Sequence, residues 1–580
     1  MAVIASDMSA VYTETAAFLT DGAVFDGNED GAFVSVSKKL KQQTEIDFFL
    51  LSYFSEKQYM HLEKMCLSGE NISAYTVSDV FAPISAKSKF PLFDEIQNRW
   101  SLYQTLVSRI YARSGFYQVS GAYGFRDQLQ DGLALISVYP ELTKLLILRA
   151  AAHQYEDGSV QHWWHGTEKT GIRTRCADDF LWLPFVTAEY IERTGDRDIL
   201  NLNIPYLSSP ALAPHEQERY ERTEKSAHRE TLFDHLLRAV SYGRRYGAHG
   251  LPLIGTCDWN DGMSTVGIKG RGESVWLAFF RLLVLRKMRS LTEDEKTVSE
   301  METEEQMLCD ALKRYGFDGK WYRRGYYDDG SVLGGNERED CKIDALPQAF
   351  AAILASESGF EKEKAKMAMD AVWQMLYDRE HLLVRLLYPP FDKDAQAPGY
   401  IKGYVPGIRE NGGQYTHAAV WTALGLFLCG ETERAVEILF AVNPAERYQH
   451  EAIATAYRIE PYVFAGDVYT NEQHVGRGGW SFYTGSAAWY RKIVLEVLYG
   501  YTERADGFCL HPHLCGAFPS FTLTVAKKQT RYVIDVSLAE APSLMLDGEY
   551  IHEKEKYFFR FDGKEHRGFL KVRKGPSTGG

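Results

Sequence analysis

The stretch Thr231-Leu-Phe-Asp-His-Leu-Leu-Arg-Ala-Val240 and the loop Leu251-Pro-Leu-Ile-Gly-Thr-Cys-Asp-Trp-Asn-Asp-Gly262 indicate both the fold and the chemistry of this chain. The first stretch has apolar residues at helical spacing, and Thr231 can cap the helix. The loop places the carboxylates of Asp258 and Asp261 around a Trp-Asn pair. Trp259 can stack on a sugar ring, and an acid beside it can protonate a glycosidic oxygen. The alternative is an Asx-rich turn next to a core tryptophan.

Helical patterns continue on both sides of this stretch, from Gly115 to about Gly500. Apolar spacing predicts helices over Asp178–Thr194, Glu273–Arg289, Glu304–Tyr315, Leu346–Glu357, Lys362–Tyr377, Thr416–Leu428 and Ser486–Tyr499. Gly195 can cap the C-terminus of the first of these. Long loops rich in glycine and aromatic residues, such as 392–414 and 466–484, lie between helices and are of a length that is usually functional. The pattern predicts a mainly α protein, an α/α toroid with a pocket at one end. A helical solenoid is disfavoured because no period of roughly 30–50 residues is visible.

Strand patterns flank this helical region. Phe33–Val36 and Ile46–Tyr53 are rich in β-branched and aromatic residues, and Pro91–Ser114 then has helical spacing. Near the C-terminus, Phe521–Val525 and Tyr532–Val536 alternate apolar and polar residues around a hairpin loop. The predicted organisation is a β region at 1–88, which the family resemblance described below interprets as a partial β-sandwich, a helical linker at 89–114, the toroid at 115–501 and a β domain at 502–580 with a disordered tail from 574.

Composition narrows the classes of partner and compartment. The chain has 580 residues and a formal net charge of −13, which argues against nucleic acid and against an anionic membrane face. No run of about twenty apolar residues and no signal-peptide pattern is present, so a cytoplasmic location is predicted. The eight cysteines form no CxxC pair, which favours a reducing compartment. Cys509 and Cys515 bracket two histidines, but at a spacing that fits no common zinc site.

Two clusters before the Asp-Trp-Asn-Asp loop also carry polar groups suited to sugars. In Gly124-Phe-Arg-Asp-Gln-Leu-Gln-Asp131, Arg126 can donate to two hydroxyls and the acids can accept from a sugar diol. The alternative is helix N-terminal acids stabilised by the helix dipole. In Gln161-His-Trp-Trp-His165 the paired histidines could hold a metal, but pocket lining is the favoured interpretation. No metal is therefore predicted.

Two clusters after the loop are suited to an anion. Arg409-Glu-Asn-Gly-Gly-Gln-Tyr-Thr-His417 ends at the start of a predicted helix, where His417 can donate to an anion together with free backbone N–H groups. The run from His474 to Trp489 is rich in glycine, and Thr484 and Gly485 stand at a second helix start. Hydroxyl and backbone donors there can cradle phosphate. No Gly-Lys-Ser/Thr follows, so a nucleoside triphosphate is not predicted.

The five clusters, in this order, resemble the family 94 glycoside phosphorylases, which include cellobiose phosphorylase. They are still more similar to the phosphorylase-like region of cyclic β-1,2-glucan synthases, from about Gly115 to Trp489. The resemblance implies an N-terminal β-sandwich, a helical linker, an (α/α)6 barrel and a small C-terminal β domain. It implies a general acid at Asp261, substrate-binding residues at Arg126, Asp131, Asp179, Trp259 and Glu410, and phosphate-binding residues at His417, Thr484 and Gly485.

The reaction implied by the resemblance is reversible, inverting phosphorolysis of a β-glucoside without a cofactor, inorganic phosphate being the co-substrate. Asp261 protonates the leaving oxygen, and phosphate attacks the anomeric carbon and yields α-glucose 1-phosphate. An inverting hydrolase needs a second carboxylate as base, whereas phosphate is already an anionic nucleophile. A β-1,2-gluco-oligosaccharide is favoured and a β-1,4 glucoside comes second, because Arg409 stands where cellobiose-active members tend to have lysine.

A second departure from the family pattern and two alternatives accompany this interpretation. The β region before the linker has under ninety residues, which is short for the full sandwich through which relatives dimerise. A homodimer is therefore a weaker expectation than in those relatives. The alternatives are an inverting hydrolase on the same barrel and a truncated carbohydrate-binding remnant with weak activity.

Overall fold

The computed structural model describes residues 83–111, 121–166, 169–551 and 557–573, and the backbone of four short strands that precede them. These strands are β1 (Thr15–Leu19), β2 (Phe25–Asp26), β3 (Ser35–Val36) and β4 (Phe49–Tyr53). β1 pairs with β4 and β2 with β3, both antiparallel. The predicted strands at 33–36 and 46–53 are thus present in part. The tail from 574, predicted to be disordered, lies outside the described residues.

The predicted linker helix is present as one continuous helical stretch. It runs through α4 (Pro91–Glu95), η1 (Ile96–Trp100), α5 (Ser101–Tyr103) and η2 (Gln104–Tyr111). Pro91 stands at the first helical position, where its missing N–H costs nothing. In η1 the backbone hydrogen bonds span five residues instead of four, since the N–H of Ser101 donates to the carbonyl of Ile96. The apolar residues Phe93, Leu106 and Ile110 of the linker helix are buried.

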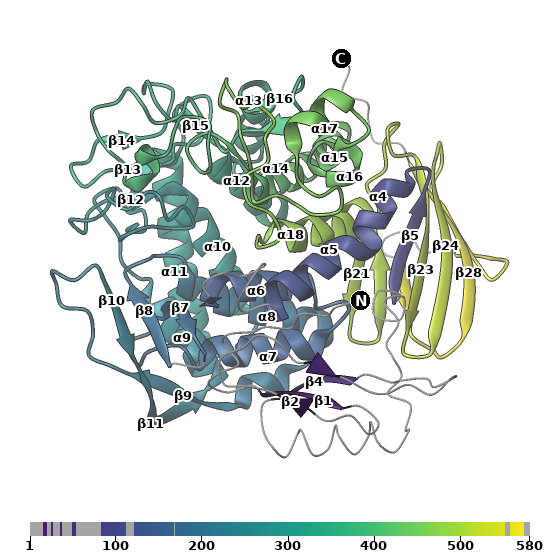
Figure 1. The fold of residues 1–580 in the computed structure, drawn as a ribbon, viewed down its shortest axis with the longest axis horizontal. Coiled ribbons are helices and arrows are strands. Elements are labelled where there is room, and N and C mark those ends of the chain that lie inside the picture. Colours follow the sequence, from purple (N-terminus) through teal and green to yellow (C-terminus); the bar gives the residue numbers. More distant parts are fainter. Residues whose placement is uncertain are drawn as a thin grey trace.

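Six helices contact one another in a closed succession, in which the last contacts the first (Figure 1). They are α6 (Phe125–Leu133), α8 (Trp182–Thr194), α10 (Val275–Arg289), α12 (Ala345–Ser358), α14 (Thr416–Leu428) and α18 (Ser486–Ile493). α10, α12 and α14 are buried over most of their length, as expected of helices that are apolar on every side. This ring is the centre of the hydrophobic core.

A second set of helices packs on the outside of the ring. α7 (Pro140–Ala151), α9 (Leu232–Tyr242), α11 (Glu295–Ala311), α13 (Lys362–Met375) and α15 (Thr432–Val442) each contact the ring helix before them in the sequence. α5 of the linker packs on α18. Shorter helices are η3 (Asp179–Leu181), η4 (Arg197–Asn201), η5 (Leu312–Gly316), η6 (Tyr400–Gly403), α16 (Pro444–Arg447), α17 (Glu451–Tyr457) and η7 (Val494–Leu498).

Two predicted helix ends coincide with their capping residues, and a third does not. Thr231 caps α9 in a capping box with Asp234, whose N–H donates to the threonine hydroxyl at 3.2 Å. Gly195 ends α8 in the left-handed region with φ 76°. α11 begins nine residues before the predicted Glu304, because Asp294 caps it there through the N–H of Thr297. In the described part of the chain, no helix combines the length and apolar character needed to cross a bilayer.

Strands are interleaved with the helices, so the architecture is mixed rather than mainly helical. Four ring helices start directly after two-residue strands, β6 (Tyr123–Gly124), β12 (Glu273–Ser274), β15 (Ile343–Asp344) and β19 (Gln414–Tyr415). A four-stranded sheet has the order β10 (Glu218–Arg222), β8 (Thr170–Thr174), β7 (Gln161–His165), β6. The other strands here are β9 (Asn203–Ser208), β11 (Glu224–Thr231), β13 (Gly325–Tyr326), β14 (Val332–Leu333), β16 (Tyr377–Asp378), β17 (Leu383–Val384), β18 (Leu387–Tyr388) and β20 (Asp467–Val468). β7 and β8 have five residues each, which is too few for an alternation of apolar and polar residues to be distinguished from helical periodicity in the sequence.

The C-terminal region forms two sheets in which most neighbouring strands are antiparallel. They lie at one side of the ring in Figure 1. Its strands are β21 (Tyr501–Arg504), β22 (Gly507–Leu510), β23 (Ser520–Lys527), β24 (Thr530–Ala539), β25 (Ser543–Leu546), β26 (Glu549–Ile551), β27 (Phe558–Arg560) and β28 (Glu565–Arg573). The predicted hairpin is present, because Lys528 and Gln529 have positive φ between paired strands β23 and β24. β5 (Ile84–Ser88) pairs with β23, so a strand from the N-terminal part completes the C-terminal sheet.

Candidate active site

The loop from Gly255 to Gly262 is anchored at its start by close backbone contact. Gly255 has φ 62°, and a side chain there would place its Cβ 2.0 Å from the carbonyl oxygen of Arg175. Only glycine fits both conditions. The backbone N–H of Ala177 donates to the carbonyl of Cys257 at 2.8 Å. The loop is therefore tied to the segment that leads into Asp178 and Asp179.

Asp258 is a buried anchor of this loop. Its two oxygens accept from Nη1 and Nη2 of Arg324 at 2.6 Å each, and Oδ2 also accepts from the Ser274 hydroxyl at 2.7 Å. Burial raises the pKa of Asp258, but the charge of Arg324 and the hydrogen bonds from Arg324, Ser274 and the Asn260 N–H together hold the pKa below its ordinary value. Ser274 caps α10, and Arg324 also donates to Asp344, which caps α12. Asp258 therefore fixes the loop to the starts of two ring helices.

Asp261 differs from Asp258 in its surroundings. Its side chain is 40% exposed, whereas that of Asp258 is fully buried. Oδ1 of Asp261 accepts from Nη2 of Arg126 at 2.6 Å and lies 3.9 Å from Nε2 of His162. Of the two acids in the motif, Asp261 is the one that can reach a substrate.

Arg126, at the start of α6, lies among carboxylates. It donates to Asp178 at 2.9 Å, to the carbonyl of Asp258 at 3.1 Å and to Asp261. Oδ1 of Asp179 lies 3.9 Å from Nε of Arg126, and Oδ2 of Asp179 accepts from Nδ1 of His162 at 2.7 Å. Burial lowers the pKa of His162, but the charge and hydrogen bond of Asp179, a hydrogen bond with Cys176 and the charge of Asp261 together raise it to well above the ordinary value. Arg126, Asp179 and Asp261, separated in the sequence, thus belong to one charged cluster.

The structure brings His417 and Gly485 together. A Cβ on Gly485 would lie 2.9 Å from Cε1 of His417, so a larger residue would fill the space between them. Gly485 is the N-cap of α18, and the hydroxyl of Thr484 beside it lies 3.0 Å from that of Ser486. The ring of Trp259 meets that of His417 edge to face at 5.2 Å. The predicted phosphate residues are therefore neighbours of the loop that carries Asp261.

His417 is a buried neutral imidazole. Its Nε2 has no hydrogen-bond partner among the described residues. Burial, and then the charge of Arg109, lower the pKa of His417 to about 3. A buried polar atom without a partner is costly unless a ligand satisfies it. Its position beside the N-terminus of α18 suits a ligand that carries oxygen acceptors.

Arg109 is a residue of this site that sequence reasoning missed. It lies in the linker, and its Nη2 would be 3.7 Å from a Cβ on Gly485. Nε donates to the buried Asp131 at 2.8 Å, and the guanidinium lies 4.3 Å from the ring centre of Tyr483. Asp131, predicted to bind substrate, thus holds Arg109 in place beneath the site. The sequence offers one signal for Arg109, which is a cation close to the apolar residues Leu106 and Ile110 of the linker helix.

Glu410 lies at another side of the site. Burial raises its pKa, although the ion pair with Arg409 at 3.5 Å opposes this. The Arg409 guanidinium lies 4.9 Å from the ring centres of both Tyr404 and Trp480. Burial and the charges of Asp261 and Glu410 raise the pKa of Tyr400. Arg409 thus contacts two aromatic rings, and Asp261 and Glu410 both lie near Tyr400.

The buried state of His417 predicts a pH dependence of stability. An unfolded histidine titrates near its ordinary pKa of 6.5, so between about pH 6.5 and pH 3 the unfolded chain binds a proton that the folded chain refuses. Stability is therefore lost as the pH falls through this window. Between about pH 7.5 and pH 5 the wild type should lose about 2 kcal/mol more than His417→Gln. Thermal unfolding of both proteins at the two pH values measures this, and an equal fall in Tm would contradict it.

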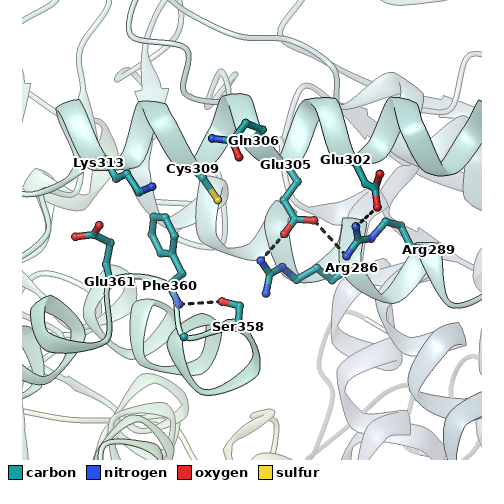
Figure 2. A pocket seen from close by; sticks show the side chains of 11 residues that line it. Arg286, Arg289, Glu302, Glu305, Gln306, Cys309, Lys313, Ser358, Phe360 and Glu361 are labelled. Atoms are coloured by element: carbon teal, nitrogen blue, oxygen red, sulfur yellow. Dashed lines mark hydrogen bonds and ion pairs between the residues drawn. The ribbon is translucent and has the colours of Figure 1, made fainter.

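The cavity in Figure 2 lies away from this site, between α10, α11 and the turn before α13. Its volume is about 460 Å³. Ion pairs line it, including Arg286 with Glu305, and Arg289 with Glu302 at 2.9 Å. No predicted site residue lines it. Most of its charged groups are already paired, and it lies where the C-terminal end of α10 meets α11.

Comparisons with known proteins agree with the position of these motifs. The family model described as glycosyl hydrolase 94 superfamily, catalytic domain, matches residues 78–500. Cyclic beta-(1,2)-glucan synthase NdvB of Rhizobium meliloti (strain 1021) is 42% identical over 449 residues, which are 77% of this chain and 16% of that protein. Solabiose phosphorylase of Paenibacillus borealis is 27% identical over 438 residues, 74% of this chain and 52% of that one. The chain thus spans a small part of the first relative and about half of the second.

A solved structure resembles the fold. The GH78 family rhamnosidase of Bacillus sp. GL1 aligns with a TM-score of 0.50 at 10% identity, covering 85% of this chain and 43% of that chain. At this identity the likeness concerns the fold alone.

Proposed function

Because the chain belongs to the glycosyl hydrolase 94 superfamily, which its motifs resemble, we propose that it is an inverting phosphorylase of a β-glucoside. The product would be α-glucose 1-phosphate. A β-1,2-gluco-oligosaccharide is the favoured substrate, because the relative at 42% identity is named for cyclic β-(1,2)-glucan. A β-1,4 glucoside comes second. We also propose that the closed succession of ring helices and the outer helices form an (α/α)6 barrel.

The observation that carries the proposal is the meeting of His417, Gly485 and Arg109 next to the loop of Asp261. These residues supply an imidazole, a helix N-terminus and a guanidinium, which together suit a phosphate dianion. A hydrolase has no use for such an anion site, because its nucleophile is water. The site therefore favours phosphorolysis over hydrolysis.

The proposed mechanism assigns Asp261 the proton for the leaving oxygen. In the structure Nη2 of Arg126 donates to Oδ1 of Asp261. We infer that a bound sugar takes over this donor of Arg126, which leaves Asp261 available to the leaving oxygen. Arg126 then bridges the sugar and Asp178, and Trp259 supplies an apolar face beside His417. Phosphate attacks the anomeric carbon from the opposite side and inverts it.

The reaction class is tested by omitting phosphate. With a β-1,2-gluco-oligosaccharide and inorganic phosphate, the protein should release α-glucose 1-phosphate, measured by a coupled assay. Free glucose should not appear at a comparable rate in phosphate-free buffer. Equal release of glucose with and without phosphate would instead support a hydrolase, and no release in either condition would support a binding remnant.

The phosphate site predicts selective kinetic effects. A donor to a charged group is worth about 1.5–3 kcal/mol, so His417→Ala and Thr484→Val should each raise the KM for phosphate roughly ten- to a hundredfold. The KM for the oligosaccharide should change much less. Thr422→Val is a matched control, because Thr422 is also buried on α14 but donates only to the carbonyl of Ala418. A parallel rise in both KM values would argue against a phosphate site.

A further inference from the structure

Two buried thiols meet beside the proposed general acid. The Sγ atoms of Cys176 and Cys257 are 2.7 Å apart, although the residues are 81 positions apart in the sequence. Backbone bonds hold them in place, since Cys176 bridges to Gly255 and the N–H of Ala177 donates to Cys257. Their meeting is therefore a consequence of the backbone rather than of a mobile side chain.

Nitrogen and oxygen donors complete this cluster. His162, Cys176 and Asp179 form one group, and Cys176, Cys257 and Asp261 form another, with possible ligand atoms within 4.8 Å of one another in each. The sequence suggested His162 and His165 as a pair of metal ligands. In the structure His162 lies with the thiols, and His165 belongs to neither group. Two thiols, an imidazole and a carboxylate are the ligand types that Zn²⁺ prefers in proteins.

The charges around the cluster suit a divalent cation. Nη1 of Arg126 lies 3.8 Å from the Sγ of Cys176. Asp178, whose Oδ1 is 3.3 Å from that sulfur, offsets this charge, together with Asp179 and Asp261. The side chain of Asp261 is 40% exposed, which gives an ion a route from solvent.

We propose that Cys176, Cys257, His162 and Asp261 form a binding site for a thiophilic divalent cation such as Zn²⁺, and that binding inhibits the enzyme. Binding releases the two S–H protons and the Nε2 proton of His162 to the buffer, forms two Zn–S bonds, one Zn–N bond and one Zn–O bond, and involves no redox change. Zn–S bonds of about 2.3 Å in a tetrahedron separate the sulfurs by about 3.8 Å, so the thiols must open by about 1 Å.

Inhibition follows from the choice of ligands. A carboxylate of Asp261 that is bound to metal cannot carry the proton for the leaving oxygen. His162 would also turn its Nε2 from Asp261 to the metal. The inhibition rests on the proposed function, whereas the binding does not.

Binding is measured on the whole chain, kept reduced with a non-chelating phosphine. Co²⁺ is the probe, because a thiolate ligand gives it a charge-transfer band in the near ultraviolet, and Zn²⁺ is then added in competition. One equivalent of Co²⁺ should give the band, and Zn²⁺ should abolish it. Cys257→Ser should weaken the affinity for Zn²⁺ at least about tenfold, since loss even of an outer-shell partner costs that much. Cys515→Ser is the matched control, a buried thiol next to a different pair of histidines, and should leave the band unchanged.

The results separate the two proposals. A missing thiolate band, or a band that persists in Cys257→Ser and disappears in Cys515→Ser, would overturn the metal site. Inhibition by Zn²⁺ is measured against the basal rate of each variant and should be reversed by a chelator. Full activity with the site saturated by Zn²⁺ would overturn the inhibitory role. Absence of phosphorolysis before any metal is added would contradict the proposed function, while the Co²⁺ band would still decide the site.

Discussion

Replacing Asp261 by Asn is expected to lower kcat for phosphorolysis by at least about a hundredfold, the low end for loss of a positioned proton donor. The amide keeps the size of the side chain but cannot release a proton to the glycosidic oxygen. Since the side chain is 40% exposed, little change in stability is expected. Steady-state rates with a β-gluco-oligosaccharide and phosphate, together with Tm, measure both effects.

The leaving group provides the control for this prediction. A nitrophenolate needs little protonation, so an aryl β-glucoside should lose much less activity in Asp261→Asn than an oligosaccharide does. This contrast separates a proton donor from a residue that only positions the sugar. An equal loss with both substrates, or no loss with either, would remove Asp261 from the role of general acid.

Replacing Asp258 by Asn is expected to act on stability. The substitution removes the charge that faces Arg324, a side chain with no exposed surface, and Asn offers one oxygen where two accept now. Breaking a buried ion pair typically costs about 3–5 kcal/mol, and Asp344 keeps the loss toward the lower end of that range. Urea unfolding of wild type and variant measures the difference in free energy.

A matched substitution in an exposed ion pair tests whether burial is the reason for this loss of stability. Asp506 pairs with Arg560 at 2.9 Å, but both side chains are more than half exposed. Asp506→Asn should therefore change the free energy of unfolding by less than about 1 kcal/mol. If Asp258→Asn were as mild as Asp506→Asn, the anchor role of Asp258 would be wrong. If it abolished activity in a fully stable protein, Asp258 would belong to the chemistry instead.

The family and the helices could be predicted from the sequence because their signals are local. The helix Thr416–Leu428 has the bounds predicted from its apolar spacing, and Thr231 and Gly195 cap the helices that they were expected to cap. Capping depends on a few adjacent residues and helical periodicity on the next turn. The motifs indicated a family that the family model confirms over residues 78–500. The roles of the individual site residues stay predictions.

Only the tertiary structure decided which of these residues meet. Asp258 and Asp261 stand three positions apart in one motif, yet Arg324 and Ser274 bury the first and leave the second half-exposed. The same holds for the approach of Arg109 to Gly485, for the contact of Cys176 with Cys257, and for β5, which pairs with β23 more than 400 residues away. The local sequence pattern determines the backbone conformation of each residue and the side of its helix or strand on which it lies. Burial, charge partners and strand partners come from distant segments, and these determine which carboxylate is a buried anchor and which stays accessible to solvent.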